Sequence, residues 1–234
     1  MSKLTGKTAI ITGSSSGIGA TIAEHLAAEG ANVVVAARRK EELNAVVERI
    51  NETGNKKAMA VVTDVSKQSD VEALVKKASE AFGPIDIYVN NAGLMERAAI
   101  TDGNVDGWDR MIDVNIKGLL YGINSVLPQM KERSTGHIVN TASVSGHEVT
   151  KVSTVYSATK YAVRAISMGL EKELARSGVR VTNISPGMVE TERNTERMPK
   201  DRKPLQTDDI ARAVIYAVTQ PDYVNVNEIT VRPV

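Results

Sequence analysis

The stretch "TAIITGSSSGIGATIAEHLAAEGANVVVAARR", residues 8–39, decides the fold. It begins with a β-branched apolar run at 8–12, turns at three glycines, continues as a helical pattern over 17–29 and ends in a second apolar run at 32–37. Short runs that are apolar on both faces are typical of buried parallel strands. The stretch therefore predicts two parallel strands joined by a right-handed crossover helix.

The same alternation continues along the chain. Further strands are expected at 57–62, 85–90, 137–142 and 180–185, and further helices at 40–52, 68–82, 106–133 and 153–176. Repeated strand–helix–strand units indicate an α/β fold, a doubly wound parallel sheet with helices on both faces. The 234 residues contain no linker or repeat, so we expect one domain over 1–234.

Composition excludes several classes of function. The net charge is +1 with the two signs interspersed, which gives no reason to expect a nucleic-acid or membrane partner. The chain has no cysteine, and its three histidines are scattered, so no metal site is predicted. No signal peptide and no apolar run of the ~18 residues that a membrane span needs is present. A cytoplasmic location fits these features.

The glycine turn points to a phosphate ligand. Gly13, Gly17 and Gly19 lie between a strand and a helix, where a tight turn brings a backbone close to a pyrophosphate at a helix N-terminus. A tight turn without ligand is the alternative. The candidate binding residues of this turn are Gly13, Ser14, Ser15, Ser16, Gly17, Ile18 and Gly19.

The end of the second strand favours NADP(H) over NAD(H). An acidic residue there binds the ribose 2′-hydroxyl of NAD, whereas arginine accommodates the 2′-phosphate of NADP. This sequence has Ala37 followed by Arg38 and Arg39. A guanidinium binds phosphate in a bidentate manner. Solvated charges at a helix start are the alternative interpretation.

With these motifs the chain resembles the short-chain dehydrogenase/reductase family. "TGSSSGIG" (12–19), "NNAG" (90–93) and "SPGMVET" (185–191) look like its cofactor motifs, and Asn115, Ser143, Tyr156 and Lys160 match its catalytic tetrad. The resemblance implies a Rossmann fold of about seven strands in the order 3-2-1-4-5-6-7. It also implies further cofactor contacts at Asp64, Val65, Asn91, Ala92, Gly93, Tyr156, Lys160, Pro186, Gly187, Val189 and Thr191.

The implied reaction transfers a hydride between nicotinamide and a carbonyl or alcohol carbon. Tyr156 is the candidate proton donor or acceptor. Lys160 lies one helical turn away, and a nearby cation is expected to lower the pKa of the phenol. Ser143 follows the fifth strand, where its hydroxyl can hold the substrate oxygen. The resemblance gives Asn115 a place in a water relay to the lysine.

Substrate contacts are less well marked. Ser143 and Tyr156, with the apolar residues Met95, Val144, Val149, Met188 and Met198, are the candidates, and packing is the alternative role of the apolar five. His147 and Glu148 read as solvated loop residues that have the reach to contact substrate. The charged segment 188–207 reads as a mobile substrate loop or an ordinary surface loop.

The leading hypothesis is an NADP(H)-dependent oxidoreductase that interconverts a small carbonyl compound and its alcohol. The C-terminal "VNVNEITVRPV" (224–234) resembles the subgroup that acts on 3-hydroxy acids, serine and related alcohols. A 3-oxoacyl-carrier-protein reductase and a non-catalytic NADP-binding regulator are the two alternatives. The resemblance also implies a homotetramer.

Overall fold

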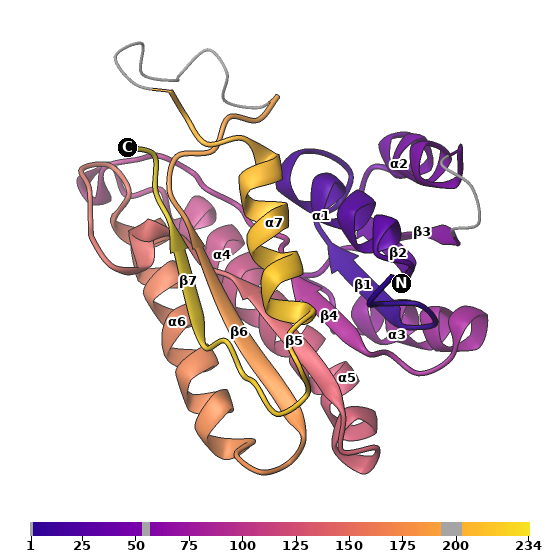
Figure 1. Ribbon diagram of the computed structural model, residues 1–234. Coiled ribbons are helices and arrows are strands. Elements are labelled where there is room, and N and C mark those ends of the chain that lie inside the picture. The colour runs from indigo at the N-terminus through magenta and orange to yellow at the C-terminus, as the bar shows by residue number, and fades with distance from the viewer. Residues whose placement is uncertain (1, 53–56, 193–202) are drawn as a thin grey trace.

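The computed structural model describes residues 2–52, 57–192 and 203–234 (Figure 1). Its centre is a seven-stranded parallel sheet in the order β3-β2-β1-β4-β5-β6-β7, which confirms the predicted fold class and strand order. The strands are β1 (Thr8–Thr12), β2 (Asn32–Ala37), β3 (Ala58–Val62), β4 (Ile87–Asn90), β5 (Gly136–Thr141), β6 (Val179–Pro186) and β7 (Glu228–Val231).

Helices cover both faces of this sheet. The helices α1 (Gly17–Ala28), α2 (Lys40–Glu52) and α7 (Thr207–Val218) pack on one face. The other face carries α3 (Gln68–Phe82), α4 (Val105–Ile112), α5 (Gly118–Glu132) and α6 (Thr154–Glu173). No helix among the described residues is long and apolar enough to cross a membrane.

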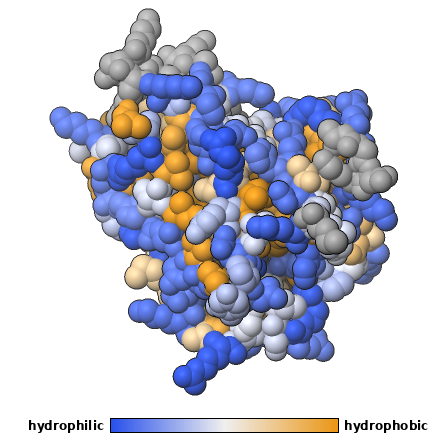
Figure 2. Space-filling view, in the orientation of Figure 1, coloured by the Kyte–Doolittle hydropathy of each residue, from blue (hydrophilic) through white to orange (hydrophobic). Residues whose placement is uncertain are grey.

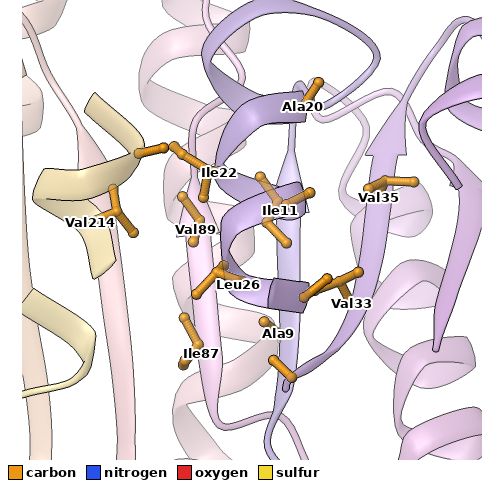
Figure 3. Close-up of a cluster of buried hydrophobic side chains, with 14 of the residues drawn as sticks. Ala9, Ile11, Ala20, Ile22, Leu26, Val33, Val35, Ile87, Val89 and Val214 are labelled. Carbon is orange, nitrogen blue, oxygen red and sulfur yellow. The ribbon is translucent and has the colours of Figure 1, made fainter. Parts of the chain in front are cut away.

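The apolar runs of the sequence become the core. Every residue of β1 is buried, because the strand has neighbours on both sides and helices on both faces. In Figure 3, Ile11 and Val33 of the sheet lie near Leu26 of α1, and Val214 of α7 lies farther along the same layer, on the other side of Val89. Since side chains alternate along a strand, Ile10 and Val34 instead join the core on the opposite face.

The helix expected over 106–133 is interrupted. The structure has α4, then one π-helical segment at Asp113–Lys117, then α5. The buried Asn115 lies within the π-helical segment and bonds to the backbone of Leu94 rather than to its own helix. The periodicity of apolar residues did not reveal this break, and the bonds between Asn115 and Leu94 join segments that are distant in the chain.

The C-terminal part contains two elements that the apolar runs did not predict individually, α7 and β7. Strand β7 forms the outer edge of the sheet, beside β6. Figure 2 shows a largely hydrophilic face on which apolar residues form a band following α7 and β7. Ile215, Ile229 and Val231 on these elements are partly buried against the core.

The segment 188–207 is described only at its two ends. Val189 and Leu205 form an isolated parallel bridge, in which the Glu190 N–H donates to the Leu205 carbonyl oxygen at 2.7 Å. Residues 193–202, which include Met198, lie outside the described residues. The mobile loop predicted for 188–207 therefore stays a prediction.

Candidate active site

The turn between β1 and α1 is packed tightly against the segment after β4. Gly13 has a φ of +66°, and a Cβ there would lie 2.7 Å from the Cα of Ala92. The Asn91 side-chain amide donates to the carbonyl oxygens of Thr12 and Gly13 at 3.0 and 3.3 Å. Helix α1 begins at Gly17, and Ser16 at its N-cap makes no side-chain cap. The first N–H groups of α1 are therefore free of a cap from Ser16.

A pocket of about 510 Å³ opens beside this turn, at the carboxyl ends of β1 to β4. It brings together most of the residues predicted to hold a cofactor: Gly13, Ser15, Ser16, Gly17, Ile18, Gly19, Arg38, Arg39, Asp64, Val65, Asn91, Ala92, Gly93 and Thr191. Ala37, the position at which the sequence lacks an acidic residue, also lines the pocket. Sequence motifs missed other lining residues, which are Thr63, Ser66, Leu94, Arg110, Asp113, Val114 and Glu192.

Six predicted cofactor residues do not line this pocket: Tyr156 and Lys160, which belong to the cluster described below, and Ser14, Pro186, Gly187 and Val189. Ser14 is fully buried, and its hydroxyl donates to Ile11 O at 2.7 Å and accepts from Ala36 N–H at 2.9 Å, so it joins β1 to β2. Val189 belongs to the apolar core. Pro186 ends β6, and the Gly187 N–H donates to Val231 O of β7 at 2.7 Å. None of these four residues lines the pocket, and their contact with a cofactor stays a prediction.

The two arginines differ in how they are held. One terminal nitrogen of Arg39 donates to the hydroxyls of Ser15 and Ser16, each at 2.9 Å, and the other to Glu42 at 2.9 Å. This arrangement places the Arg39 guanidinium over the glycine turn. Arg38 also lines the pocket, and Ala37 places no carboxylate there.

Tyr156 and Lys160 lie one turn apart on α6. The Lys160 ammonium donates to Thr141 O of β5 at 2.8 Å and lies 5.8 Å from the centroid of the Tyr156 ring. Ser143 precedes the short 3₁₀ turn η3 (Val144–Gly146), and its Oγ accepts from the Ser145 N–H at 3.1 Å. The Ser143 side chain lies near the Tyr156 phenol, whose pKa it acts to lower.

Burial controls the acidity of both groups on α6. Lys160 is 4% exposed, and loss of solvation lowers its pKa to about 8. Burial also raises the pKa of Tyr156, and the nearby Ser143 side chain lowers it only in part. The expected lowering of the Tyr156 pKa by Lys160 is therefore wrong, because desolvation of the phenol outweighs the favourable contacts.

The side-chain amide of Asn115 forms hydrogen bonds to the segment after β4. Its Oδ1 accepts from Leu94 N–H at 2.8 Å, while Nδ2 donates to Leu94 O at 2.8 Å and to the Thr159 hydroxyl at 3.0 Å. A small cavity of about 10 Å³ lies between Asn115 and Lys160. That volume is close to the minimum for one water molecule.

Three of the apolar candidate substrate residues are exposed. Met95, Val149 and Met188 are 44%, 60% and 37% exposed, and none of the three lines the large pocket. Val144 lies in η3 directly after Ser143.

The two solvated-loop candidates are in fact paired. His147 Nε2 lies 3.0 Å from a carboxylate oxygen of Glu228, and Glu148 pairs with Arg232 at 3.1 Å. No local signal in the sequence marks Glu228 or Arg232, because both come from the last strand and the residues after it.

Comparison with known proteins gives the same answer at three levels. Two uncharacterized oxidoreductases, from Staphylococcus aureus (strain MW2) and Staphylococcus saprophyticus, are each 55% identical over the full length of both chains. An alcohol dehydrogenase from the archaeon Thermococcus sibiricus, complexed with 5-hydroxy-NADP, superposes with a TM-score of 0.90 at 31% identity over 97% of each chain.

A serine dehydrogenase complexed with NADP+ gives a TM-score of 0.90 at 32% identity, covering 96% of this chain and 94% of that one. The family model for short chain dehydrogenases matches residues 7–202. The chain is therefore an oxidoreductase of the short-chain dehydrogenase family.

Proposed function

We propose that the protein is an NADP(H)-dependent oxidoreductase that interconverts a small carbonyl compound and its alcohol, with Tyr156 as the general acid and base. One observation carries the proposal: Ser143, Tyr156 and Lys160 converge at the carboxyl edge of the sheet, next to the pocket of the glycine turn. Ligands of such sheets bind outside the carboxyl ends of the strands.

The pocket fits a dinucleotide. Gly13 and Gly19 let the turn pack closely on itself and on the segment after β4, since a Cβ at either position would lie within 3 Å of protein atoms. The start of α1 offers N–H groups and a positive dipole end to a pyrophosphate. The Arg39 guanidinium, fixed by Ser15 and Ser16, is suited to a 2′-phosphate. When bound, the nicotinamide supplies or accepts the hydride.

The residues of the chain supply position and a proton. The raised pKa keeps the Tyr156 phenol protonated at neutral pH, so it is ready to donate as negative charge develops on a carbonyl oxygen. Ser143 provides a second hydrogen bond to that oxygen. Lys160, with a pKa of about 8, is mostly protonated at pH 7 and stabilises the phenolate that remains after donation.

The alcohol dehydrogenase and the serine dehydrogenase among the similar structures favour small hydroxy compounds as substrates. In this proposal Met95, Val144, Val149 and Met188 contact the substrate. Their flexible or compact apolar side chains suit the carbon skeleton of such a compound. Asn115 fixes the segment after β4 through its bonds to Leu94. In this proposal it also takes part in a water relay to Lys160.

A substrate panel tests the proposal. NADPH consumption is followed with small ketones, aldehydes and a 3-oxoacyl thioester, and NADP+ reduction with serine and 3-hydroxy acids. We expect turnover of small compounds and a higher kcat/KM with NADPH than with NADH. Preference for the thioester would indicate the carrier-protein reductase, and NADPH binding without turnover of any compound would indicate the regulator.

We further propose a homotetramer in the cytoplasm. Leu120, Tyr161 and Met168 on α5 and α6 are 42%, 40% and 52% exposed, which leaves apolar surface for a second copy to cover. Native mass spectrometry tests this: a monomer at micromolar concentration contradicts it.

A further inference from the structure

Glu228 is the first residue of β7, at the edge of the sheet. It pairs in register with Asn183 of β6, which in turn pairs with Asn140 of β5. The Asn140 side-chain amide donates to the Ser167 hydroxyl of α6 at 2.9 Å. Because residues in register share a face of a parallel sheet, the Glu228 side chain lies on the face that α6 covers.

The Glu228 carboxylate joins three segments. Arg164 of α6 binds it in a bidentate manner, at 2.9 Å from Nε and 3.1 Å from the terminal nitrogen. His147, which follows η3, lies 3.0 Å from the same oxygen that Arg164 Nε contacts. Asn183 and Ser185 of β6 also donate to this oxygen, at 3.1 and 3.3 Å.

The carboxylate is ionised at neutral pH. Burial acts to raise the pKa of Glu228, but the hydrogen bond and charge of Arg164, with the charge of His147 and the bond from Asn183, hold it below the ordinary value. The side chains of Glu228, Arg164 and His147 are 31%, 22% and 27% exposed. At such exposure solvent screens the charges, so the pairing contributes more to geometry than to stability.

These contacts end on the turn that carries Ser143. The second terminal nitrogen of Arg164 donates to Gly146 O at 3.0 Å. Gly146 N–H donates in turn to Ser143 O at 2.8 Å, and a Cβ on Gly146 would lie 2.8 Å from Lys160 O. The turn therefore packs directly against α6, with little freedom to slide along it.

We propose that Glu228 is a positioning residue: by holding Arg164 and His147 together it fixes the Ser143 turn relative to the helix that carries Tyr156 and Lys160. The inference rests on the proposed function, in which Ser143 and Tyr156 share one substrate oxygen. Two hydrogen bonds to one atom require their donors to hold a fixed separation, and small displacements are costly in catalysis.

A double-mutant cycle tests this inference. Glu228→Ala is expected to lower kcat by about 10-fold to 100-fold while the Kd for NADPH stays within about twofold, because the displaced turn lies outside the dinucleotide pocket. In a Ser143→Ala background the same substitution is expected to change kcat by less than about twofold, since the hydroxyl that it positions is gone. Glu228→Gln, which keeps one acceptor oxygen, should restore part of kcat.

The matched control is Glu24→Ala. Glu24 also accepts from an arginine Nε at 3.0 Å and is 37% exposed, but it lies on α1. Glu24→Ala should leave kcat unchanged in the unmodified protein and in the Ser143→Ala background. Equal losses from Glu228→Ala with and without the Ser143 hydroxyl, or no loss at all, would overturn the positioning role.

Hydrogen exchange separates failure of this inference from failure of the proposed function. Glu228→Ala should speed amide exchange of the peptide containing residues 143–148, and Glu24→Ala should not. Absence of turnover in the unmodified protein would refute the proposed function, yet the exchange rates would still decide whether Glu228 holds the turn. Unchanged exchange in Glu228→Ala would refute the inference alone.

Discussion

The glycine-turn pocket and the Tyr156 site lie along the same edge of the sheet, yet they are held together in different ways. Backbone at the ends of β1 to β4 shapes the pocket, and Arg39 comes from the same strand–helix–strand unit as the glycines. The Tyr156 site consists of side chains from α6 and from the turn after β5, and the neighbouring Glu228 cluster adds side chains of β6 and β7. The pocket should therefore be sensitive to added atoms, and the Tyr156 site to lost polar groups.

Removal of the Tyr156 hydroxyl should have the largest effect. Tyr156→Phe is expected to lower kcat by about 10²-fold to 10⁴-fold, the usual value of a general acid, with the Kd for NADPH little changed. Tyr161→Phe, on the same helix and 40% exposed, is the control. Retained activity in Tyr156→Phe would remove the acid–base role and the contrast between the two regions.

Lys160 should reveal the cost of burying a charge. Its pKa is about 8 in the folded protein against an ordinary value of 10.5, so the unfolded chain holds more protons between these pH values. Stability relative to Lys160→Met should then rise by about 3 kcal/mol between pH 8 and pH 10.5.

Urea unfolding of the unmodified protein and of Lys160→Met between pH 8 and pH 10.5 measures the difference in their free energies of unfolding. Lys76→Met, on the exposed face of α3, controls for removal of a lysine. A stability gap between the unmodified protein and Lys160→Met that is constant with pH would contradict the desolvated lysine.

Added atoms should separate the glycine turn from an ordinary turn. Gly13 and Gly103 have similar φ values of +66° and +64°, but only Gly13 faces backbone within 4 Å. Alanine costs about 1 kcal/mol at either position for its positive φ, and Gly13→Ala should cost about 1–3 kcal/mol more for the contact with Ala92. Equal changes in the free energy of unfolding for Gly13→Ala and Gly103→Ala would show that the glycine turn can shift to accommodate a Cβ.

Arg39→Ala should have the smallest effect of the four. Loss of one charged hydrogen-bonding partner is expected to weaken NADPH binding by about tenfold and NADH binding by less than about twofold. Fluorescence titration with each cofactor measures the two Kd values, and Arg49→Ala, which lies on α2 in a pair with Glu24, is the control. An equal effect on both cofactors would leave the 2′-phosphate without its proposed partner.

Local sequence patterns predicted the glycine-turn region well. The runs at 8–12 and 32–37 became β1 and β2 with the expected bounds, because a strand buried on both faces needs an unbroken apolar run. The glycines could be recognised because they lie between a predicted strand and a predicted helix. Yet three adjacent serines did not reveal that Ser14 turns into the interior, where its hydroxyl joins β1 to β2, while Ser15 and Ser16 meet Arg39.

By itself the sequence determined the alternation of strands and helices, the glycine turn and the spacing of Tyr156 and Lys160, since each depends on residues that are near in the chain. Only the tertiary structure decided the direction of the Tyr156 pKa, the π-helical break at Asn115 and the place of Glu228 beside His147 and Arg164. All three involve burial or contacts between segments that are distant in the chain, and neither is visible in local periodicity.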